Sequence, residues 1–330
     1  MNPFELVRVD DLASAAREGK ANPDGVFKAA GIDLLDRLKE RQFQPTALVD
    51  LLGMKKELGG IAVAADGSVS IGALTTLAQI ASAEQLADPA FAGLREAAGV
   101  AATPQIRNRA TLGGNLLQQA RCWYLRNAAF PCAHKGGETC FALYGENRYH
   151  SVLNHHDCVR VHPSNTAPAL LALAAEATIQ HGDGEKRIPL LELWPQPADA
   201  KGPDHTLAPG EVLTRVHLPK PAKNSRSAYL ESREKLSFDW PTTAAAAWVE
   251  LKDGKIVAAR VCLGAVAPLP VPVAQAGELL VGQTPSVELF QAVAEAAFAG
   301  ATPLYQNGYK VQVGKAIVVA ALQQATGLSE

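Results

Sequence analysis

Four of the five cysteines lie within one segment of the chain, and this grouping is the clearest sign of chemistry in the sequence. They are Cys122, Cys132, Cys140 and Cys158, whereas Cys262 stands alone. Because disulfide frameworks are typical of small secreted chains, grouped thiols in a chain of this length indicate a metal site instead. Zinc usually binds closely spaced cysteine pairs, which do not occur here, whereas a [4Fe–4S] cluster accepts four thiolates from wider, irregular loops. The spacing favours iron–sulfur over zinc, with separately buried cysteines as the alternative to both.

Residues 118–160, which carry these cysteines, show no sustained hydrophobic period of a helix or a strand. We expect an irregular insertion that a bound metal, rather than a hydrophobic core, holds together. His134, His155 and His156 lie in the same segment and could replace one thiolate. Single histidines are, however, more often surface or hydrogen-bonding groups.

Two glycine-bearing segments have the composition of phosphate-binding turns. In Thr111-Leu112-Gly113-Gly114-Asn115, the paired glycines would let the backbone approach a ligand closely and present N–H groups to a phosphate. The turn from Ala29 to Leu35 opens a predicted helix, whose N-terminus could also direct N–H groups at an anion. A plain turn explains each pattern equally well when it is taken alone.

The elements that must position these residues alternate between short strands and helices, which predicts an α+β fold. The first fifty residues form a βαβ-like unit, with strands at 4–9, 26–29 and 47–51. Asp66-Gly67 and Asp253-Gly254 each separate two alternating segments and predict tight hairpins. Helices are predicted over residues 76–81, 90–98, 166–175, 287–299 and 311–324. The Pro- and Lys-rich residues 219–226 are predicted to link two domains.

Composition excludes several classes of function. The 31 Lys and Arg residues nearly balance 33 Asp and Glu residues, so the net charge of −2 gives no basic field for nucleic acid or anionic membranes. A hydrophobic content of 48% is ample for a packed core. The longest apolar runs fall far short of the roughly 20 residues that span a bilayer, and the first residues lack the apolar stretch of a secretory signal. We therefore expect a soluble chain without a membrane span or an export signal of its own.

Taken together, the motifs resemble the FAD-binding medium subunit of the molybdenum hydroxylases, the family of xanthine dehydrogenase and carbon monoxide dehydrogenase. The resemblance extends from Phe4 to about Leu322. In that family an A-G-G-T-D/N-L-L turn binds the FAD pyrophosphate, and it aligns here with Ala29 to Leu35. A second FAD loop, A-T-x-G-G-N-L, matches Ala110 to Leu116, and the family's H-P-S-D matches His162 to Asn165.

The four cysteines lie between the second FAD loop and His162, and their order and spacing resemble one branch of the family. That branch carries an extra [4Fe–4S] cluster, as in 4-hydroxybenzoyl-CoA reductase and the bacterial periplasmic aldehyde oxidoreductase. The resemblance implies that Cys122, Cys132, Cys140 and Cys158 bind this cluster. It implies FAD contacts from Phe27, Lys28, Ala29, Ala30, Gly31, Ile32, Asp33, Leu34, Leu35, Thr111, Gly113, Gly114, Asn115 and Asn165.

Several residues depart from the family pattern at the expected FAD site. Ala30 replaces a glycine and Ile32 a threonine, which removes a hydroxyl group. If the replaced glycine has a positive φ, an alanine there costs roughly 1 kcal/mol or more. Asn165 replaces the aspartate of H-P-S-D, and Glu231 stands where a basic residue is common.

The resemblance also implies a domain organisation. The fold is a two-subdomain FAD-binding fold of the vanillyl-alcohol-oxidase type, followed by a small α+β C-terminal domain. The FAD-binding region is expected at residues 1–220. It divides into an N-terminal βαβ subdomain at 1–57 and a second subdomain at 58–220 that contains the insertion at 118–160. The C-terminal domain is expected at 225–330.

The implied function is electron transfer, without substrate-activating residues in this chain. The implied partners are a large molybdenum-cofactor subunit, a small [2Fe–2S] subunit and an external electron acceptor. The alternatives are a non-redox structural subunit with a four-cysteine zinc site, a member that has lost FAD and keeps only the cluster, and a free-standing flavoenzyme of the same fold. The compartment is expected to be the cytoplasm, or the periplasm by co-export with a signal-bearing partner.

Overall fold

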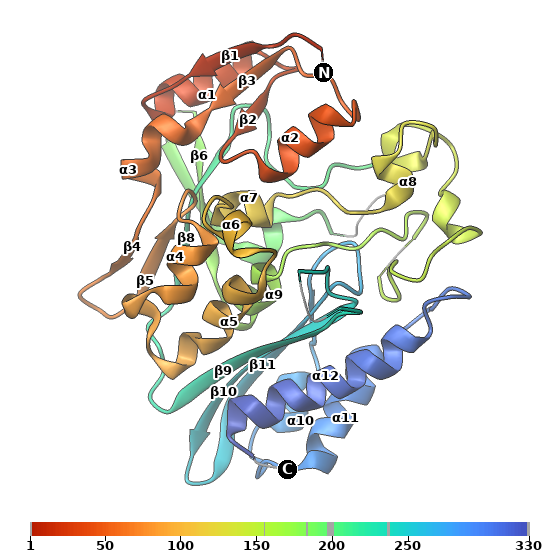
Figure 1. Ribbon diagram of the computed structural model, residues 1–330. Coiled ribbons are helices and arrows are strands. Elements are labelled where there is room, and N and C mark those ends of the chain that lie inside the picture. The colour runs from red at the N-terminus through yellow and green to blue at the C-terminus, as the bar shows by residue number, and fades with distance from the viewer. Residues whose placement is uncertain (1, 155, 183, 197–200, 236–237, 329–330) are drawn as a thin grey trace.

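The computed structural model describes residues 2–154, 156–182, 184–196, 201–235 and 238–328. This part of the chain contains three β-sheets, which follow one another in the sequence and are each packed against helices (Figure 1). The predicted α+β class is confirmed. Among the described residues, no helix combines the length and hydrophobicity that crossing a bilayer requires.

The N-terminal unit is a small parallel sheet with two helices. The strands are β1 (Glu5–Arg8), β2 (Val26–Lys28) and β3 (Ala47–Asp50), in the order β1-β3-β2, joined through α1 (Leu12–Ala21) and α2 (Ile32–Lys39). Asp11 caps α1, because its carboxylate accepts a 2.7 Å hydrogen bond from the N–H of Ser14. The parallel arrangement agrees with the βαβ-like unit that the sequence predicts.

The second unit is a five-stranded antiparallel sheet in the order β4-β5-β8-β6-β7. Its first two strands form the hairpin predicted at Asp66-Gly67, where Gly67 has a φ of 88°. The capping box of Thr76 and Gln79 begins α4, as the sequence predicts within one residue. The strands are β4 (Ile61–Val63), β5 (Val69–Gly72), β6 (Glu176–His181), β7 (Gly184–Pro189) and β8 (Val212–Leu218), and the helices are α3 (Lys55–Leu58), α4 (Leu77–Ser82), α5 (Ala92–Val100), α6 (Pro104–Arg107), α7 (Leu112–Leu116) and α9 (Thr166–Ala172).

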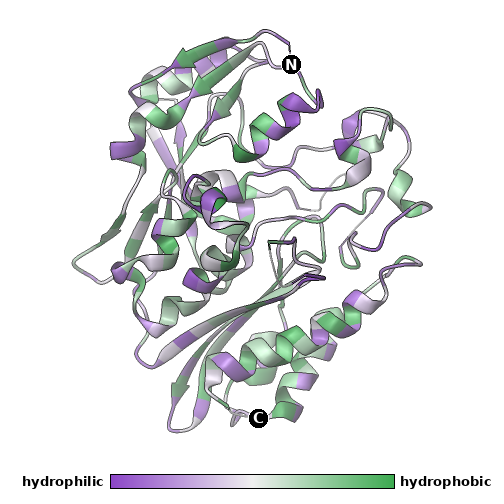
Figure 2. Cartoon of the chain, viewed as in Figure 1, coloured by the Kyte–Doolittle hydropathy of each residue, from purple (hydrophilic) through white to green (hydrophobic). Residues whose placement is uncertain are grey.

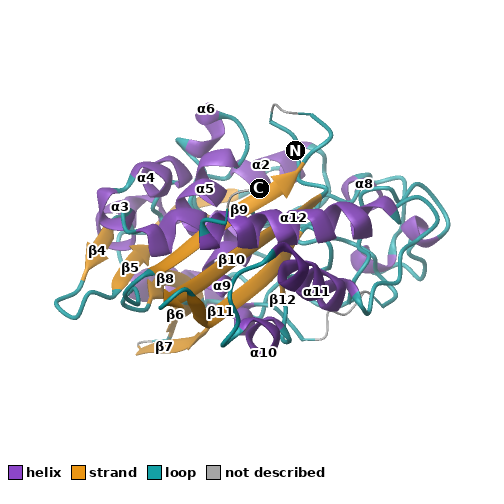
Figure 3. Cartoon of the chain, turned by 90° about the horizontal axis from the view of Figure 1, so that it is seen from below, coloured by secondary structure: helices purple, strands orange, loops and turns teal. Residues whose placement is uncertain are grey.

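The third unit is an antiparallel sheet in the order β12-β11-β10-β9, and both of its faces are covered. Figure 3 shows α12 lying across this sheet, and the hydrophobic colouring in Figure 2 runs along the strands and the helices beside them. On the opposite face, α5 packs against β9, and α9 packs against β10 and β11. The elements are β9 (Ser225–Ser232), β10 (Thr243–Lys252), β11 (Lys255–Gly264), β12 (Val271–Pro272), α10 (Ala276–Leu280), α11 (Val287–Phe298) and α12 (Tyr309–Thr326).

This sheet corrects one prediction and confirms another. Residues 219–226 were expected to be a linker. Residues 219–224 form no helix or strand, but β9 begins at Ser225, so the last two residues of the predicted linker belong to this strand, and Ser227 accepts a 2.9 Å hydrogen bond from the N–H of Gly93 in α5. The hairpin at Asp253-Gly254 is confirmed, with φ values of 52° and 75° that its tight turn requires.

The insertion at 118–160 contains the short helix α8 (Trp123–Arg126) and single turns of 3₁₀ helix, so the expected irregular backbone is observed. It nevertheless has a small core of its own. Tyr124, Phe130 and Phe141 pack edge to face or stacked, with ring centroids 5.0–6.1 Å apart. The sequence analysis did not anticipate this aromatic cluster, because its members follow no helical or strand period.

Lys310 joins the insertion to the C-terminal domain. Its side chain is fully buried, and Nζ donates hydrogen bonds to the carbonyl oxygens of Tyr149, His150 and Ala265 at 2.8–3.1 Å. Asn307 supports the same junction, since its Nδ2 atom donates to the carbonyl oxygens of His150 and Ser151. One ammonium group thus satisfies three buried acceptors from two distant segments.

We therefore expect Lys310→Met to destabilise the protein by about 3 kcal/mol or more, because three buried carbonyl groups lose their donor. Thermal unfolding of the purified chain measures this as a fall in Tm of several degrees. Lys315→Met is the matched control on the same helix, because it removes only a surface ion pair with Glu295. Equal Tm values for the two variants would contradict the role assigned to Lys310.

Candidate functional site

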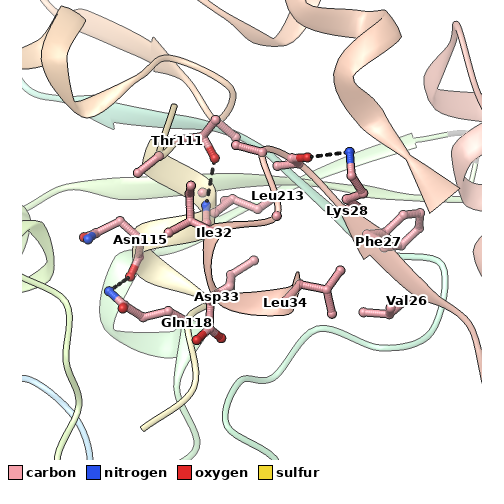
Figure 4. A pocket seen from close by; sticks show the side chains of 18 of the residues that line it. Val26, Phe27, Lys28, Ile32, Asp33, Leu34, Thr111, Asn115, Gln118 and Leu213 are labelled. Atoms are coloured by element: carbon pink, nitrogen blue, oxygen red, sulfur yellow. Dashed lines mark hydrogen bonds between the residues drawn. The ribbon is translucent and has the colours of Figure 1, made fainter. Parts of the chain in front are cut away.

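One cavity of about 680 Å³ lies between the N-terminal unit, the second unit and the β9–β10 connection. This volume is within the range of small-molecule and cofactor sites. Figure 4 shows the side chains of Lys28, Ile32, Asp33, Thr111, Asn115 and Gln118 around it. The two glycine-bearing segments that the sequence singled out therefore face one space.

The structure brings nearly all of the expected FAD contacts to this cavity. Residues 27–34 line it, together with Thr111, Gly113, Gly114, Asn115 and Asn165. The exception is Leu35, which instead packs against the buried side chains of Leu34, Leu38 and Leu48. Leu35 thus belongs to the packing of α2 against its sheet.

The N-terminus of α2 lies at the cavity and has no side-chain cap. Its N-cap is Gly31, with φ 79° and ψ 11°, and this residue offers no side-chain cap to the N–H groups of the first turn. These groups and the helix dipole favour an anion. The positive φ falls at Gly31, and Ala30 is not among the described non-glycine residues with positive φ. The substitution of alanine at position 30 therefore carries no left-handed strain.

The Thr111–Asn115 loop differs from the expectation that it presents free N–H groups. The N–H groups of Leu112 and Gly113 donate to the carbonyl oxygens of Thr75 and Ala73 at 2.9 and 2.8 Å, and the N–H of Gly114 donates to Thr111 Oγ1 at 3.2 Å. A Cβ atom at position 113 would lie 3.1 Å from the Cβ of Ala73. Close packing on Ala73 therefore favours a glycine here, whatever the ligand.

Asn165 and Glu231, two departures from the family pattern, contact each other. Asn165 Nδ2 donates to Glu231 Oε2 at 2.7 Å, and the hydroxyl of Tyr229 donates to the same oxygen at 2.6 Å. Glu231 also pairs with Arg233. An aspartate at position 165 would place a second carboxylate against Glu231, whereas the amide donates to it. The two departures are therefore complementary.

Both carboxylate oxygens of Asp33 bind residues of the insertion. Oδ1 pairs with Arg121 at 2.9 Å and with Arg126 at 2.7 Å, and Oδ2 accepts from the N–H of Gln119 at 3.1 Å. Burial alone would raise the pKa of Asp33, but the two arginines outweigh it, so the pKa lies below its ordinary value. Asp33 was expected to contact the cofactor. It lines the cavity, and its carboxylate connects α2 to the insertion.

The four cysteines of the insertion line one small pocket, which Cys262 does not reach. Cys140 shares a hydrogen bond with Cys158, which lowers the pKa of Cys140 to about 6. Burial raises the pKa of Cys122 to about 11, and its sulfur lies 3.1 Å from His150 Nε2. Cys132 is buried. Residues separated by up to 36 positions thus present their thiols to one place, without forming disulfides.

Among the described residues, no group of three or more His, Cys, Asp or Glu side chains is arranged to hold a metal ion. A zinc site needs its four ligands within about 2.3 Å of a single ion. A [4Fe–4S] cluster differs, because each thiolate binds its own iron and the sulfurs need not converge on one point.

The nearby histidines offer little as replacement ligands. His134 lines the cysteine pocket, but its Nε2 atom lies 3.0 Å from Asp204 Oδ1. His156 is exposed and lies outside the pocket lining, and His155 lies outside the described residues. His150, which the sequence analysis did not consider, is the histidine in contact with a cysteine.

Several residues of the large cavity were not found from the sequence. Residues 207–213 and 238–241 line it, and so do Gln118 and Arg121. The guanidinium of Arg121 lies over the ring of Trp240, 4.5 Å from its centroid. The dipeptide Pro209-Gly210 could have indicated a turn at this wall of the cavity. Gly210 has a φ of 83°, and a Cβ atom there would lie 2.8 Å from the Ala16 carbonyl oxygen.

Comparison with known proteins gives two consecutive family matches. Residues 2–221 match the FAD binding domain in molybdopterin dehydrogenase, and residues 227–325 match the CO dehydrogenase flavoprotein C-terminal domain. The chain is 32% identical over 328 residues to the aldehyde oxidoreductase FAD-binding subunit PaoB of Escherichia coli, covering 98% of this chain and 99% of the relative. It is 28% identical to the carbon monoxide dehydrogenase medium chain of Afipia carboxidovorans, over 91% and 88% of the two chains.

Solved structures show the same fold. Carbon monoxide dehydrogenase from Hydrogenophaga pseudoflava superimposes with a TM-score of 0.76 at 24% identity, covering 99% of each chain. Quinoline 2-oxidoreductase from Pseudomonas putida 86 gives a TM-score of 0.74 at 24% identity, over 99% and 98% of the two chains. The predicted two-part fold with a C-terminal α+β domain is thereby confirmed.

Gly31→Ala is expected to lower the affinity for FAD by about fivefold or more. A Cβ atom at φ 79° costs roughly 1–2 kcal/mol, and a turn that changes shape to relieve this strain no longer presents the N–H groups of α2 to the ligand. The measurement is titration of FAD into the flavin-free chain. Gly254→Ala imposes comparable strain at φ 75° in a hairpin outside the cavity lining and serves as the control. Unchanged FAD affinity in Gly31→Ala would place the ligand away from the start of α2.

Proposed function

The chain belongs to the family of FAD-binding subunits of molybdenum hydroxylases, and from this premise we propose that it is an electron-transfer subunit with a second, iron–sulfur site. In this proposal the large cavity holds FAD, and Cys122, Cys132, Cys140 and Cys158 hold a [4Fe–4S] cluster. The observation that carries the proposal is the gathering of these four thiols in one pocket beside a cavity of cofactor size.

The residues around the cavity are suited to FAD. The first turn of α2 supplies uncapped N–H groups for the pyrophosphate, and the bare backbone at Gly114 allows close approach. Lys28, whose Nζ atom lies 3.1 Å from Asp50 Oδ2, adds a positive charge at the same wall. When bound, FAD supplies the ability to take up an electron pair and release single electrons. The absence of strain at Ala30 argues against the alternative in which FAD binding has been lost.

The cysteine pocket is suited to a cluster, because four thiols gather in it. Aromatic rings of Tyr124 and Phe141 line it together with the four thiols, so the site is sheltered from water. His150 Nε2 is placed to donate a hydrogen bond to Cys122 Sγ, and such contacts orient ligands and tune iron–sulfur centres. The order and spacing of the four cysteines, which resemble the branch with the extra cluster, support the same assignment.

The proposal assigns substrate chemistry to partner chains. The relatives are named as FAD-binding subunits and medium chains of larger oxidoreductases. We infer a large molybdenum-cofactor subunit, a small [2Fe–2S] subunit and an external acceptor as the partners here. The compartment is proposed to be the cytoplasm, or the periplasm if a signal-bearing partner exports the assembled complex.

Iron, sulfide and flavin analysis of the purified complex, with its visible spectrum, tests the proposal directly. We expect about four irons and one FAD beyond those that the partner subunits carry. Cys132→Ser should lose these irons, because one thiolate of the cluster is removed. Cys262→Ser is the matched control, since both sulfurs are buried but Cys262 lies in β11. An intact cluster in Cys132→Ser, or zinc in place of iron, would refute the assignment.

The isolated chain should accept electrons from a chemical reductant but should not oxidise an aldehyde or purine. Adding both partner subunits should restore substrate-dependent reduction of flavin and cluster, followed by absorption. Turnover of substrate by the chain alone, at the rate of the complex, would support the free-standing flavoenzyme instead.

A further inference from the structure

Asp33 belongs to the turn that lines the large cavity, but its carboxylate binds the cysteine-bearing insertion. It follows Gly31 and Ile32 in the turn that opens α2, and it lines the large cavity. Its side chain is 15% exposed, and every contact of its carboxylate described above is made with the insertion. The nearest of these contacts in sequence is 86 residues away.

The segment that Asp33 holds contains Cys122. Gln119 and Arg121 precede this cysteine, and Arg126 follows it within one helical turn of α8. Arg126 also closes the segment on itself, because Nε donates to the carbonyl oxygen of Ala120 at 3.0 Å and Nη2 to that of Gln119 at 3.1 Å. The backbone around Cys122 is thus folded over the guanidinium that Asp33 binds.

Asp36 of α2 and Gln42, just beyond the helix, make further contacts with the same segment. Arg126 Nη1 pairs with Asp36 at 3.3 Å, and Gln42 Nε2 donates to the carbonyl oxygen of Arg126 at 2.8 Å. The side chain of Asp36 is 56% exposed, so its pair is worth less than the buried one at Asp33. Without the Asp33 carboxylate, Arg121 and Arg126 would remain as two neighbouring, mostly buried cations with no shared counter-charge.

We propose that Asp33 is a positioning residue that couples the two sites, so that an occupied cysteine pocket strengthens FAD binding and bound FAD strengthens cluster retention. This rests on the proposed function, in which the cavity holds FAD and the cysteines hold the cluster. Ligation of Cys122 fixes residues 119–126, these residues fix Asp33, and Asp33 fixes the first turn of α2 against the FAD pyrophosphate. Because coupling free energies are reciprocal, each occupant must favour the other by the same factor.

The test titrates FAD into flavin-free, full-length chain in two states: with the cluster reconstituted from iron and sulfide, and after its removal by a chelator. For the wild-type chain we expect FAD to bind at least about fivefold more weakly without the cluster. Asp33→Asn should bind FAD weakly in both states, with a ratio near one. Asp36→Asn, the control on the same helix, should keep the wild-type ratio.

A second measurement follows iron instead of flavin. At equilibrium with a competing chelator, bound FAD should increase the iron retained by the wild-type and Asp36→Asn chains, and should not do so in Asp33→Asn. The wild-type arm does not depend on the folding of any variant. Equal FAD affinities of the cluster-loaded and cluster-free wild-type chain would overturn the coupling, and so would a wild-type ratio in Asp33→Asn. A wild-type chain that binds no iron, or no FAD, contradicts the proposed function itself.

Discussion

The burial of the C-terminal sheet on both faces is the constraint on which the rest of the structure depends. In β10, Ala246 and Trp248 face one hydrophobic core with Leu94 and Leu170, while Ala247 and Val249 face another with Phe290 and Leu322. A strand buried on both faces is nearly continuously apolar, and the run from Thr243 to Val249 is of this kind. The second unit and the C-terminal domain therefore cannot separate without exposing this sheet to water.

This constraint also shapes the cavity. The connection from β9 to β10 carries residues 238–241 to the cavity wall, where Trp240 meets Arg121 of the insertion. The cavity is lined by segments that lie far apart in the chain, from residue 19 to residue 241. The insertion reaches it through Arg121, so two consecutive residues, Arg121 and Cys122, line the cavity and the cysteine pocket.

Local features were predictable from the sequence because local chemistry determines them. The hairpins at Asp66-Gly67 and Asp253-Gly254 follow from the positive φ of a tight turn, and the cysteine pocket was inferred from spacing alone. Features that join distant residues were not predictable. No periodicity relates Asp33 to Arg126, or Asn165 to Glu231, and β9 was missed at its start because Pro and Lys residues before it suggested a linker. The individual FAD contacts stay predictions, although the cavity is placed where they require it.

The pair of Asn165 and Glu231 has a consequence for how this chain can change. Replacing Asn165 with aspartate alone would oppose two carboxylates, and replacing Glu231 with lysine alone would put an ammonium group beside the Arg233 guanidinium. Tyr229 and Arg233, which both bond to Glu231, would lose their acceptor in the second case. A chain with only one of the two replacements is therefore less stable than a chain with Asn165 and Glu231, or than a chain with an aspartate and a basic residue at these positions. The two positions are epistatic, and an ancestral or designed sequence has to carry them together.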